Sequence, residues 1–250
     1  MEIKKILVSQ PRPATERSPY YDIAEKFGVE IDFHPFIKVE SLSSKEFRQQ
    51  KVSILNHTAI VFNSRHAIDH FFTLCKDLRI TVPETMKYFC TSETISLYIQ
   101  KYVQYRKRKV FFGDTGKFAD LLPIMVKHSA EKYFVPQSEA HTDEITNLLK
   151  KHKLNFSEAV MYRTVANDIS QVDCLGYDMI IFFTPIGVQA LLQKYPDYKQ
   201  GEVAIGCYGP ATAKAVKDLG LRLDFEAGAT ASTSITAALS DFLKAQKKKK

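Results

Sequence analysis

Short runs of β-branched and aromatic residues alternate with amphipathic helical segments along the whole chain. Such alternation is typical of parallel α/β folds, because each helix returns the chain across a sheet to begin the next parallel strand. The pattern predicts ten strands, near residues 4–9, 30–35, 58–63, 87–90, 109–113, 132–136, 158–163, 178–183, 202–206 and 222–227. Ten strands in 250 residues suit two small doubly wound sheets of five strands each.

The segments between the strands carry apolar residues three and four positions apart, as helices that cover a sheet do. The predicted helices are SRHAIDHFFTLCKDL, TSETISLYIQKYV, DEITNLLKKH, GVQALLQKY and PATAKAVKDLG. Gly220 is the last residue of the fifth segment, where it is predicted to end the helix, and Ser232 or Thr233 is predicted to cap the final helix.

Two strand-and-helix units resemble one another within the chain. AIVFNSRHAIDHFF aligns with MIIFFTPIGVQALL at an offset of 120 residues, which places Ser64 opposite Thr184. TSETISLYIQKY aligns with GPATAKAVKDLG at an offset of 118, which places Thr94 opposite Thr212. Two related halves would explain both matches, and so would the general similarity of alternating α/β segments.

Charge and cysteine usage narrow the class of protein. Four of the seven excess positive charges lie in the terminal run 247–250, which is expected to be solvated and disordered. A second basic run, 106–109, reads as a loop; because neither run has interleaved aromatic residues or a groove-reading helix, no nucleic-acid partner is expected. The cysteines are widely spaced and are predicted to be core thiols; they are Cys75, Cys90, Cys174 and Cys207.

No stretch approaches the roughly 18 apolar residues of a membrane span, so no membrane contact is expected. The first residues, MEIKKILVSQ, lead directly into a strand pattern instead of a signal peptide. These two features predict a cytoplasmic protein.

Several familiar sites are missing from the sequence. It contains no GxxxxGK[ST], no GxGxxG after a strand and no GxSxG, which disfavours nucleotide enzymes and serine hydrolases. His66 and His70 are four residues apart and would share one helical face, as two metal ligands can. No third ligand lies nearby and the surrounding HFF suits a core, so no metal is predicted.

One arrangement recurs, in which a strand is followed by small or hydroxyl residues and then by a helix. It occurs at FNSRHA, YFCTSET, FFTPIG and AIGCYGPAT. Each such turn presents free backbone N–H groups and the positive end of a helix dipole, which together favour an anion. In parallel sheets these turns lie at the carboxyl edge, where ligands usually bind, although every doubly wound domain has such turns.

The ordered set of motifs resembles the uroporphyrinogen-III synthases. The chain opens with a strand near an Arg-Pro (ILVSQPRP), continues to a turn of FTS-N-A-V type (VFNSRHAI), and has a Tyr-x-Thr after a strand (VMYRTVA). A turn of FTSP type (FFTPIGV) and a G-x-x-T-A helix start (GPATAKAV) follow, with EAGATAST in the place of a later A-x-x-P-T segment. Order and spacing agree over nearly the whole chain.

The chain departs from the family's pattern at three places. CTSETIS lacks a glycine that the family commonly has there, and VPQSEAHTDEI replaces a loop that is richer in glycine. The Arg-Pro is displaced by the preceding SQP, which puts the role of Arg12 in doubt.

The resemblance implies two flavodoxin-like α/β lobes joined by a two-stranded connector. Residues 1–35 and 165–250 would form the first lobe and residues 40–160 the second, with 36–39 and 161–164 as the connector. EIDFHPF and EAVMYRT would be the crossing strands, and closure of the lobes would fold a flexible substrate.

The resemblance also implies an activity. The family's substrate is hydroxymethylbilane, a linear tetrapyrrole with several carboxylates, and the enzyme closes it with loss of water and inversion of the last ring, using no cofactor. Tyr162 would hydrogen-bond the departing hydroxyl and protonate it, since a phenol is protonated at neutral pH. Its other possible role is packing at the connector. The residues expected to bind substrate are Thr212, Thr184, Ser64, Arg65, Gly209, Ala211, Thr94, Arg12 and Ser138.

Other readings remain open at this stage. The threonines could cap helices, and Arg65 could be an exposed residue at a helix start. A non-catalytic two-lobed binding protein, or a degenerate family member kept for interaction, would share the architecture. The expected partners are the small-molecule substrate and, transiently, the upstream hydroxymethylbilane synthase, with a monomer as the expected state.

Overall fold

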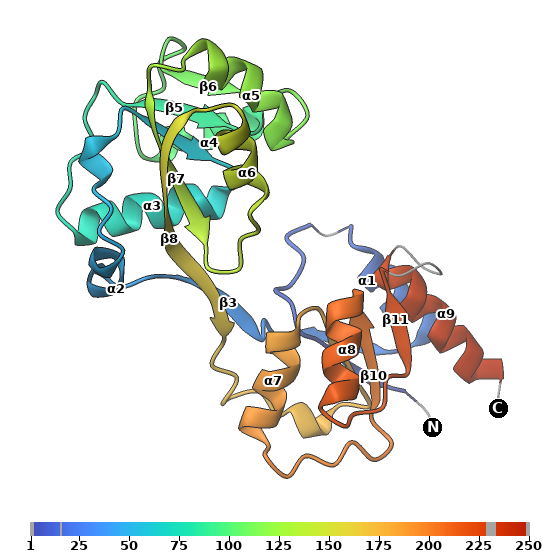
Figure 1. Ribbon diagram of the computed structural model, residues 1–250. Coiled ribbons are helices and arrows are strands. Elements are labelled where there is room, and N and C mark those ends of the chain that lie inside the picture. Colours follow the sequence, from blue (N-terminus) through green and yellow to red (C-terminus); the bar gives the residue numbers. More distant parts are fainter. Residues whose placement is uncertain (1–2, 16, 229–233, 249–250) are drawn as a thin grey trace. The chain divides into compact units, whose positions relative to one another are not determined.

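The computed structural model describes residues 3–15, 17–228 and 234–248, and it divides into two compact units. Unit 1 combines residues 1–38 with 165–250, and unit 2 comprises residues 39–164 (Figure 1). A short N-terminal segment therefore folds together with the last third of the chain, and the middle of the chain forms a unit of its own.

Unit 1 is built on a five-stranded sheet in the order β11-β10-β9-β1-β2, in which every adjacent pair is parallel. Its strands are β1 (Lys5–Val8), β2 (Glu30–Phe33), β9 (Met179–Phe182), β10 (Ala204–Tyr208) and β11 (Phe225–Ala227). Numbered within the unit, this is the flavodoxin-like order 2-1-3-4-5.

Two pairs of helices cover the sheet of unit 1, one pair on each face (Figure 1). One face packs against α1 (Pro19–Phe27) and α9 (Ile235–Lys248), and the other against α7 (Pro185–Lys194) and α8 (Pro210–Asp218). Successive strand residues serve opposite faces: Ile180 faces α7 and α8, and Ile181 faces α1 and α9. Both faces are covered, so the central strand β9 is a continuous buried apolar run, whereas β2 at the edge of the sheet carries Glu30 and Asp32.

Unit 2 is built on a six-stranded sheet in the order β3-β8-β7-β4-β5-β6. Its strands are β3 (Ile37–Ser41), β4 (Ala59–Phe62), β5 (Lys87–Cys90), β6 (Val110–Phe112), β7 (Lys132–Ser138) and β8 (Asn155–Ala166). The pairs from β8 to β6 are parallel, and the register of β7 on β8 shifts between Gln137 and Ser138.

The helices of unit 2 also lie on both faces of its sheet. They are α2 (Ser44–Gln49), α3 (Arg65–Asp77), α4 (Glu93–Tyr98), α5 (Phe118–Lys127) and α6 (Glu144–Lys151), with 3₁₀ turns at Ile54–Asn56 and Ile99–Lys101. Phe62 packs on the face of α3, and Val61 packs on the face of α5 and α6.

The strand orders support the internal correspondence that the sequence suggested. Strands β4, β5 and β6 occupy the places in their sheet that β9, β10 and β11 occupy in theirs, and β7 and β8 correspond to β1 and β2. Ser64 and Thr184 are both N-caps, 120 residues apart. The second alignment is off by one residue, because the caps Ser92 and Gly209 are 117 residues apart. Thr94 therefore corresponds to Ala211 and not to Thr212.

Two expectations about the strands are wrong. The segment EIDFHPF does not cross between units, since β2 pairs with β1 inside the sheet of unit 1. The crossings occur in β3, whose IKVES sequence was not predicted as a strand, and in the long strand β8. Among the described residues there are consequently eleven strands, five in one sheet and six in the other.

The ends of helices follow local chemistry. Gly220 has φ 75° and lies just after the end of α8, as predicted, while Ser232 and Thr233 lie outside the described residues. Helix α9 continues to Lys248 and the Lys247 ammonium lies 5.2 Å from the centre of the Phe27 ring, so the prediction of a disordered lysine tail is wrong for these two residues.

All four cysteines are buried free thiols. No described helix has the length and apolarity to cross a membrane.

Candidate functional site

The turn between β4 and α3 in unit 2 brings two predicted site residues together. Ser64 ends the extended segment after β4 and caps α3, accepting a hydrogen bond from the Ala67 N–H at 3.1 Å. Its hydroxyl also lies 3.5 Å from the Tyr162 hydroxyl, which comes from β8. The carboxyl end of β4 is thus where the predicted acid meets a predicted binding residue.

Tyr162 is held by a stacked histidine. The rings of Tyr162 and His70 are 5.0 Å apart and nearly parallel, at 18°, and the side chain of Tyr162 is only 8% exposed. His70 Nδ1 lies 2.7 Å from the Ser41 hydroxyl, which comes from β3. The ring of His66, one turn earlier on α3, stacks on the ring of His70. Burial lowers the pKa of His70 and the nearby His66 lowers it further, so His70 is neutral at neutral pH. A neutral ring against the phenol fixes the direction of the hydroxyl without adding charge.

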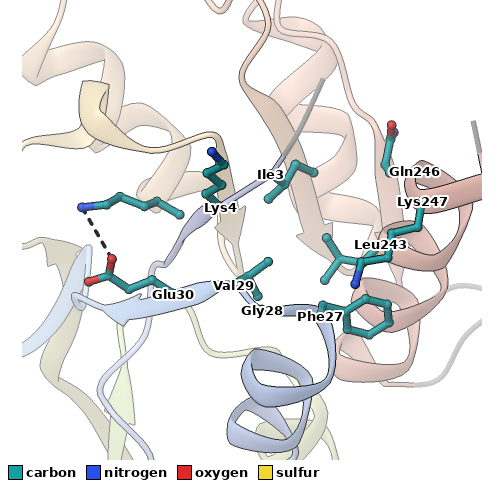
Figure 2. A pocket seen from close by; sticks show the side chains of 10 residues that line it. Ile3, Lys4, Phe27, Gly28, Val29, Glu30, Leu243, Gln246 and Lys247 are labelled. Carbon is teal, nitrogen blue, oxygen red and sulfur yellow. Dashed lines mark ion pairs between the residues drawn. The ribbon is translucent and has the colours of Figure 1, made fainter. Parts of the chain in front are cut away.

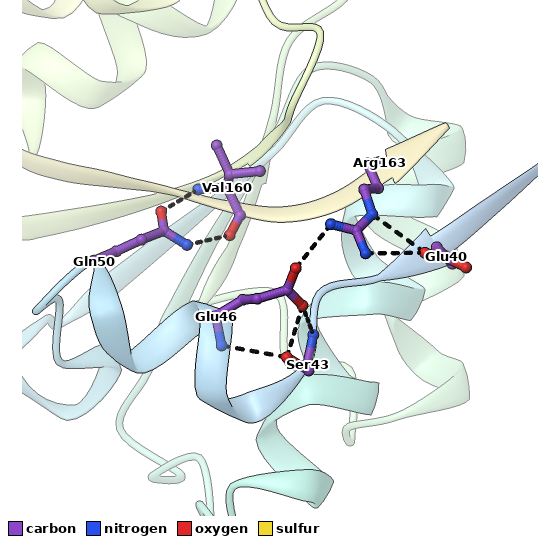
Figure 3. Close-up of polar contacts among 6 residues, drawn as sticks. All are labelled: Glu40, Ser43, Glu46, Gln50, Val160 and Arg163. Atoms are coloured by element: carbon purple, nitrogen blue, oxygen red, sulfur yellow. Dashed lines mark hydrogen bonds and ion pairs between the residues drawn. The ribbon is translucent and has the colours of Figure 1, made fainter. Parts of the chain in front are cut away.

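Arg163 follows Tyr162 in β8 and has a structural role. Its side chain lies on the other face of the strand, because successive strand residues point in opposite directions. Arg163 donates to Glu40 in β3 and to Glu46 in α2, at 3.2 and 2.8 Å (Figure 3). The Gln50 side chain bonds the backbone N–H and carbonyl of Val160, each at 2.8 Å. Helix α2 and Gln50, the residue directly after it, thereby hold β8 on both sides of Tyr162.

Helix α3 also carries an acid that gathers three donors. Asp69 accepts hydrogen bonds from the hydroxyls of Tyr98 and Tyr102 and from the Lys101 ammonium. Burial alone would raise the pKa of Asp69, but these donors outweigh it and the pKa lies below its usual range. The exposed guanidinium of Arg65 lies 5.3 Å from the centre of the Tyr98 ring. Asp69 positions Tyr98, and the Tyr98 ring in turn supports Arg65 at the first position of α3.

Two further predicted residues of unit 2 lie at the same edge of the sheet. Ser138 ends β7 directly opposite Tyr162 in the strand pair. Thr94 is exposed in the first turn of α4, whose cap is Ser92. Ser64, Ser138 and Tyr162 are therefore neighbours in the sheet edge, and Thr94 lies one strand further on.

The turns of unit 1 correct two of the predictions. Thr184 caps α7, accepting from the Gly187 N–H at 3.1 Å. Gly209, and not Thr212, occupies the cap position of α8, with φ 85°. The Gly209 N–H donates to the Ala227 carbonyl at 2.8 Å, so it is not available to a ligand as predicted. Thr212 is almost fully buried, which leaves the exposed Ala211 with the accessible N–H of this first turn.

Arg12 lies exposed in the segment between β1 and α1. Among the residues that the structure describes, Arg12 has no hydrogen-bond or ion-pair partner that would fix the direction of its side chain. Its role in binding therefore stays a prediction.

The histidine and its serine partner were missed by sequence reasoning. His66 and His70 drew attention only as two possible metal ligands, and the described residues hold no group of three or more His, Cys, Asp or Glu that could bind a metal ion. Ser41 belongs to the strand that was not predicted. Nothing local in the sequence indicates that His70 meets a tyrosine 92 positions later.

A cavity of about 630 Å³ lies in unit 1, away from the turns described above (Figure 2). It is formed at the start of β1 and β2 and by the ends of α1 and α9, with Phe27 and Leu243 among its apolar residues and Lys5 paired with Glu30 at 3.5 Å. This is the amino edge of the sheet, the edge opposite to the one where ligands of parallel sheets bind.

Comparison with known proteins identifies the family. The family model described as Uroporphyrinogen-III synthase HemD matches residues 18–236, and comparison with curated proteins gives no significant match. A uroporphyrinogen-III synthetase of Helicobacter pylori has the same fold, with a TM-score of 0.56 and 14% identity over 97% of this chain and 100% of that one. A mutant uroporphyrinogen III synthase of Thermus thermophilus gives a TM-score of 0.47 at 14% identity, covering 98% and 99% of the two chains. Because the family model spans most of the sequence, the chain belongs to the uroporphyrinogen-III synthase family and is an enzyme of haem biosynthesis.

Proposed function

We propose that this enzyme is a lyase that converts hydroxymethylbilane into uroporphyrinogen III. The observation that carries the proposal is the family match over residues 18–236. It is supported by the position of Tyr162, whose ring lies against His70 and whose hydroxyl lies beside Ser64 at the carboxyl edge of the sheet.

The proposed reaction begins with loss of the hydroxyl of the hydroxymethyl group. The Tyr162 hydroxyl donates a hydrogen bond to this leaving group and transfers a proton, so that it departs as water. The electron pair of the first pyrrole ring expels it and leaves a protonated azafulvene. The substituted α-carbon of the last ring bonds to the azafulvene methylene carbon and gives a spiro intermediate. The older bond from that α-carbon to the bridging methylene of the third ring then breaks, the freed methylene bonds to the unsubstituted α-carbon of the last ring, and the proton lost from that carbon returns to the Tyr162 phenolate.

Positioning supplies the selectivity in this proposal. Hydroxymethylbilane closes without help to the type I isomer, so the enzyme must hold the conformer that leads to the spiro intermediate. Side-chain and backbone donors at the turns suit the carboxylates of such a substrate. In unit 2 these are Ser64 and Arg65, with Ser138 and Thr94 nearby, and in unit 1 they are Thr184 and the first turn of α8.

His70 is proposed to act on Tyr162 through packing. The stacked neutral imidazole prevents the phenol from rotating away from the edge of the sheet. The pyrroles supply the electrons of the reaction, so the proposed mechanism requires neither a metal ion nor an organic cofactor.

The proposal extends to the setting of the reaction. The substrate decays on its own, which favours its direct transfer from hydroxymethylbilane synthase in the cytoplasm. The enzyme is proposed to act there as a monomer, since one chain carries every group that the mechanism uses.

The decisive experiment supplies freshly generated hydroxymethylbilane to the purified protein, oxidises the products and separates the type I and type III uroporphyrins. A type III excess over the protein-free control is expected. The Tyr162→Phe variant should lose about 100-fold or more of the rate, because general acid catalysis contributes at least that much. Tyr105→Phe, which removes a hydroxyl from the segment before β6, is the matched control and should keep the wild-type rate.

Two outcomes would contradict the proposal in different ways. Only type I product, formed at the uncatalysed rate, would refute the synthase activity and favour a two-lobed binding protein. Type III product formed at an unchanged rate by Tyr162→Phe would leave the activity intact and remove Tyr162 from the mechanism.

A further inference from the structure

An exposed tyrosine stands at the carboxyl edge of the sheet of unit 1. Tyr208 is the last residue of β10 and is 42% exposed, although the four residues before it in the strand are buried. Its ring is nearly parallel to that of Phe183, which follows β9, with centroids 6.3 Å apart and an angle of 25°. Two adjacent strands thus end in a pair of nearly parallel aromatic rings.

The backbone fixes this pair in place. A Cβ atom at Gly228 would lie 3.1 Å from two atoms of the Tyr208 ring and 3.3 Å from the Gly209 nitrogen. These distances are shorter than most contacts that Cβ atoms make in proteins. Gly228 also has φ 79°, which other residues rarely adopt. The ring therefore rests on a bare segment of backbone after β11, and its position is set by the fold.

The chemistry around the rings indicates what they could bind. Thr184 and the start of α7 follow Phe183, and Gly209 and the start of α8 follow Tyr208. The apolar rings consequently lie next to backbone N–H groups and helix N-termini that favour an anion. Such a neighbourhood fits a flat aromatic ring that carries carboxylates.

We infer that Tyr208 and Phe183 form an aromatic shelf that packs against one pyrrole ring of the tetrapyrrole substrate. The inference rests on the proposed function and adds a binding contact in unit 1 that involves none of the predicted site residues. Pyrrole rings are electron-rich and flat, so an offset stack on the shelf buries apolar surface while the carboxylates of the ring turn toward the first turns of α7 and α8.

Steady-state kinetics with hydroxymethylbilane test the shelf. Tyr208→Ser should raise KM about tenfold and leave kcat within about twofold, whereas Tyr208→Phe should behave like the wild type because it keeps the ring. Gly228→Ala should also raise KM, since the new methyl group displaces the ring of Tyr208. An unchanged KM in Tyr208→Ser, with a normal circular dichroism spectrum, overturns the inference.

A binding measurement separates this inference from the proposed activity. The chain has no tryptophan, so Tyr208→Trp introduces a single fluorophore at the shelf. Anaerobic titration with uroporphyrinogen III should quench its emission with saturation. Leu175→Trp, at a position 58% exposed in a 3₁₀ turn of the same unit, is the control and should show no saturable change.

The two readouts fail separately. If the wild type forms no type III product but the Tyr208→Trp emission is quenched with saturation, the proposed activity fails and the shelf stands. If type III product forms and the Tyr208→Trp emission does not change, or changes as in the Leu175→Trp control, the shelf is refuted and the activity stands.

Discussion

The two units share one order of strands but hold their helices together differently. In unit 2, Asp69 on α3 accepts hydrogen bonds from Tyr98 in α4 and from Tyr102 and Lys101 just after it. The corresponding position in unit 1, 120 residues later, is the exposed Gln189 on α7. There α7 and α8 contribute small side chains such as Ala190 and Ala213 to a common apolar cluster.

This difference separates the scaffold from the chemistry. Both units place a capping hydroxyl, Ser64 or Thr184, at the same turn, so the cap belongs to the shared frame. Unit 2 adds polar and ionisable side chains at its edge, among them Tyr162 and His70, whereas unit 1 adds the aromatic ring of Tyr208. The proposed acid and the proposed shelf therefore lie on matching edges with different chemical character.

The largest predicted effect tests whether corresponding core residues contribute equally to the stability of the two units. Phe62 and Phe182 occupy corresponding positions at the ends of β4 and β9, and both side chains are fully buried. Replacing either by alanine should lower the free energy of unfolding by about 3–5 kcal/mol, because a large cavity remains. Urea unfolding monitored by circular dichroism measures the loss.

Hydrogen exchange locates the damage in these two variants. Phe62→Ala should lower protection mainly in β4, β5 and α3, and Phe182→Ala mainly in β9, β10 and α7. Equal loss of protection in both units from either substitution would show that the units unfold together. It would refute the prediction that each substitution mainly affects its own unit.

The strands and helix caps that depend on neighbouring residues could be predicted from the sequence, and those that depend on distant residues could not. The strands β4 and β9 are uninterrupted apolar runs followed by hydroxyl residues, so both strands and both caps could be placed from local signals. Strand β3 alternates charged and apolar residues over five positions and follows another strand without a helix, so it was missed. The general architecture and the family prediction are confirmed by the structure and by the family match.

The arrangement of the site was less predictable because it depends on contacts between distant residues. Tyr162 reaches Ser64 and His70 only because β8 lies beside β7 with a register shift at Gln137 and Ser138, which no local pattern reports. The internal alignment was off by one residue at this helix, because the caps of α4 and α8 are Ser92 and Gly209, 117 positions apart. Short segments do not fix an offset to that precision.

A second prediction sharpens the difference in how the helices are joined. Asp69→Ala should destabilise the protein by about 2 kcal/mol, because hydrogen bonds to a charged group are worth roughly 1.5–3 kcal/mol and the tyrosine hydroxyls can partly turn to water. The matched control in unit 1, Gln189→Ala, should change stability by less than about 0.5 kcal/mol. Equal effects in urea unfolding would mean that the Asp69 cluster does not stabilise unit 2.

Asp69→Ala should also alter substrate binding. Without the carboxylate, the Tyr98 ring is no longer fixed beneath the Arg65 guanidinium, so KM for hydroxymethylbilane should rise. Asp69→Asn keeps an acceptor for one hydroxyl and should lie between the wild type and Asp69→Ala in both measurements. A lower stability with an unchanged KM would confine the role of Asp69 to folding.

The smallest predicted effect concerns the ion pair between Glu46 and Arg163 in unit 2, next to Tyr162 in the sequence. Hydrogen bonds from the side chain and the backbone of Ser43, together with the Arg163 guanidinium, lower the pKa of Glu46 from its usual 4.5 to about 2 (Figure 3). A carboxyl group with a lowered pKa in the folded state stabilises the fold at a pH above its ordinary pKa. That contribution is lost progressively as the pH falls from about 4.5 toward about 2.

Glu46→Gln tests the direction of this dependence, since glutamine can still complete the capping box but carries no charge. The wild type should unfold at a slightly higher urea concentration than Glu46→Gln at pH 7, and the gap should close between pH 4.5 and pH 2. Ser43→Ala should narrow the gap more than Arg163→Gln, because the Ser43 side chain makes the largest contribution to the lowered pKa. A gap that is the same at every pH would show that the charge of Glu46 contributes nothing, and that the contacts of Gln50 with Val160 and uncharged hydrogen bonds suffice to hold β8.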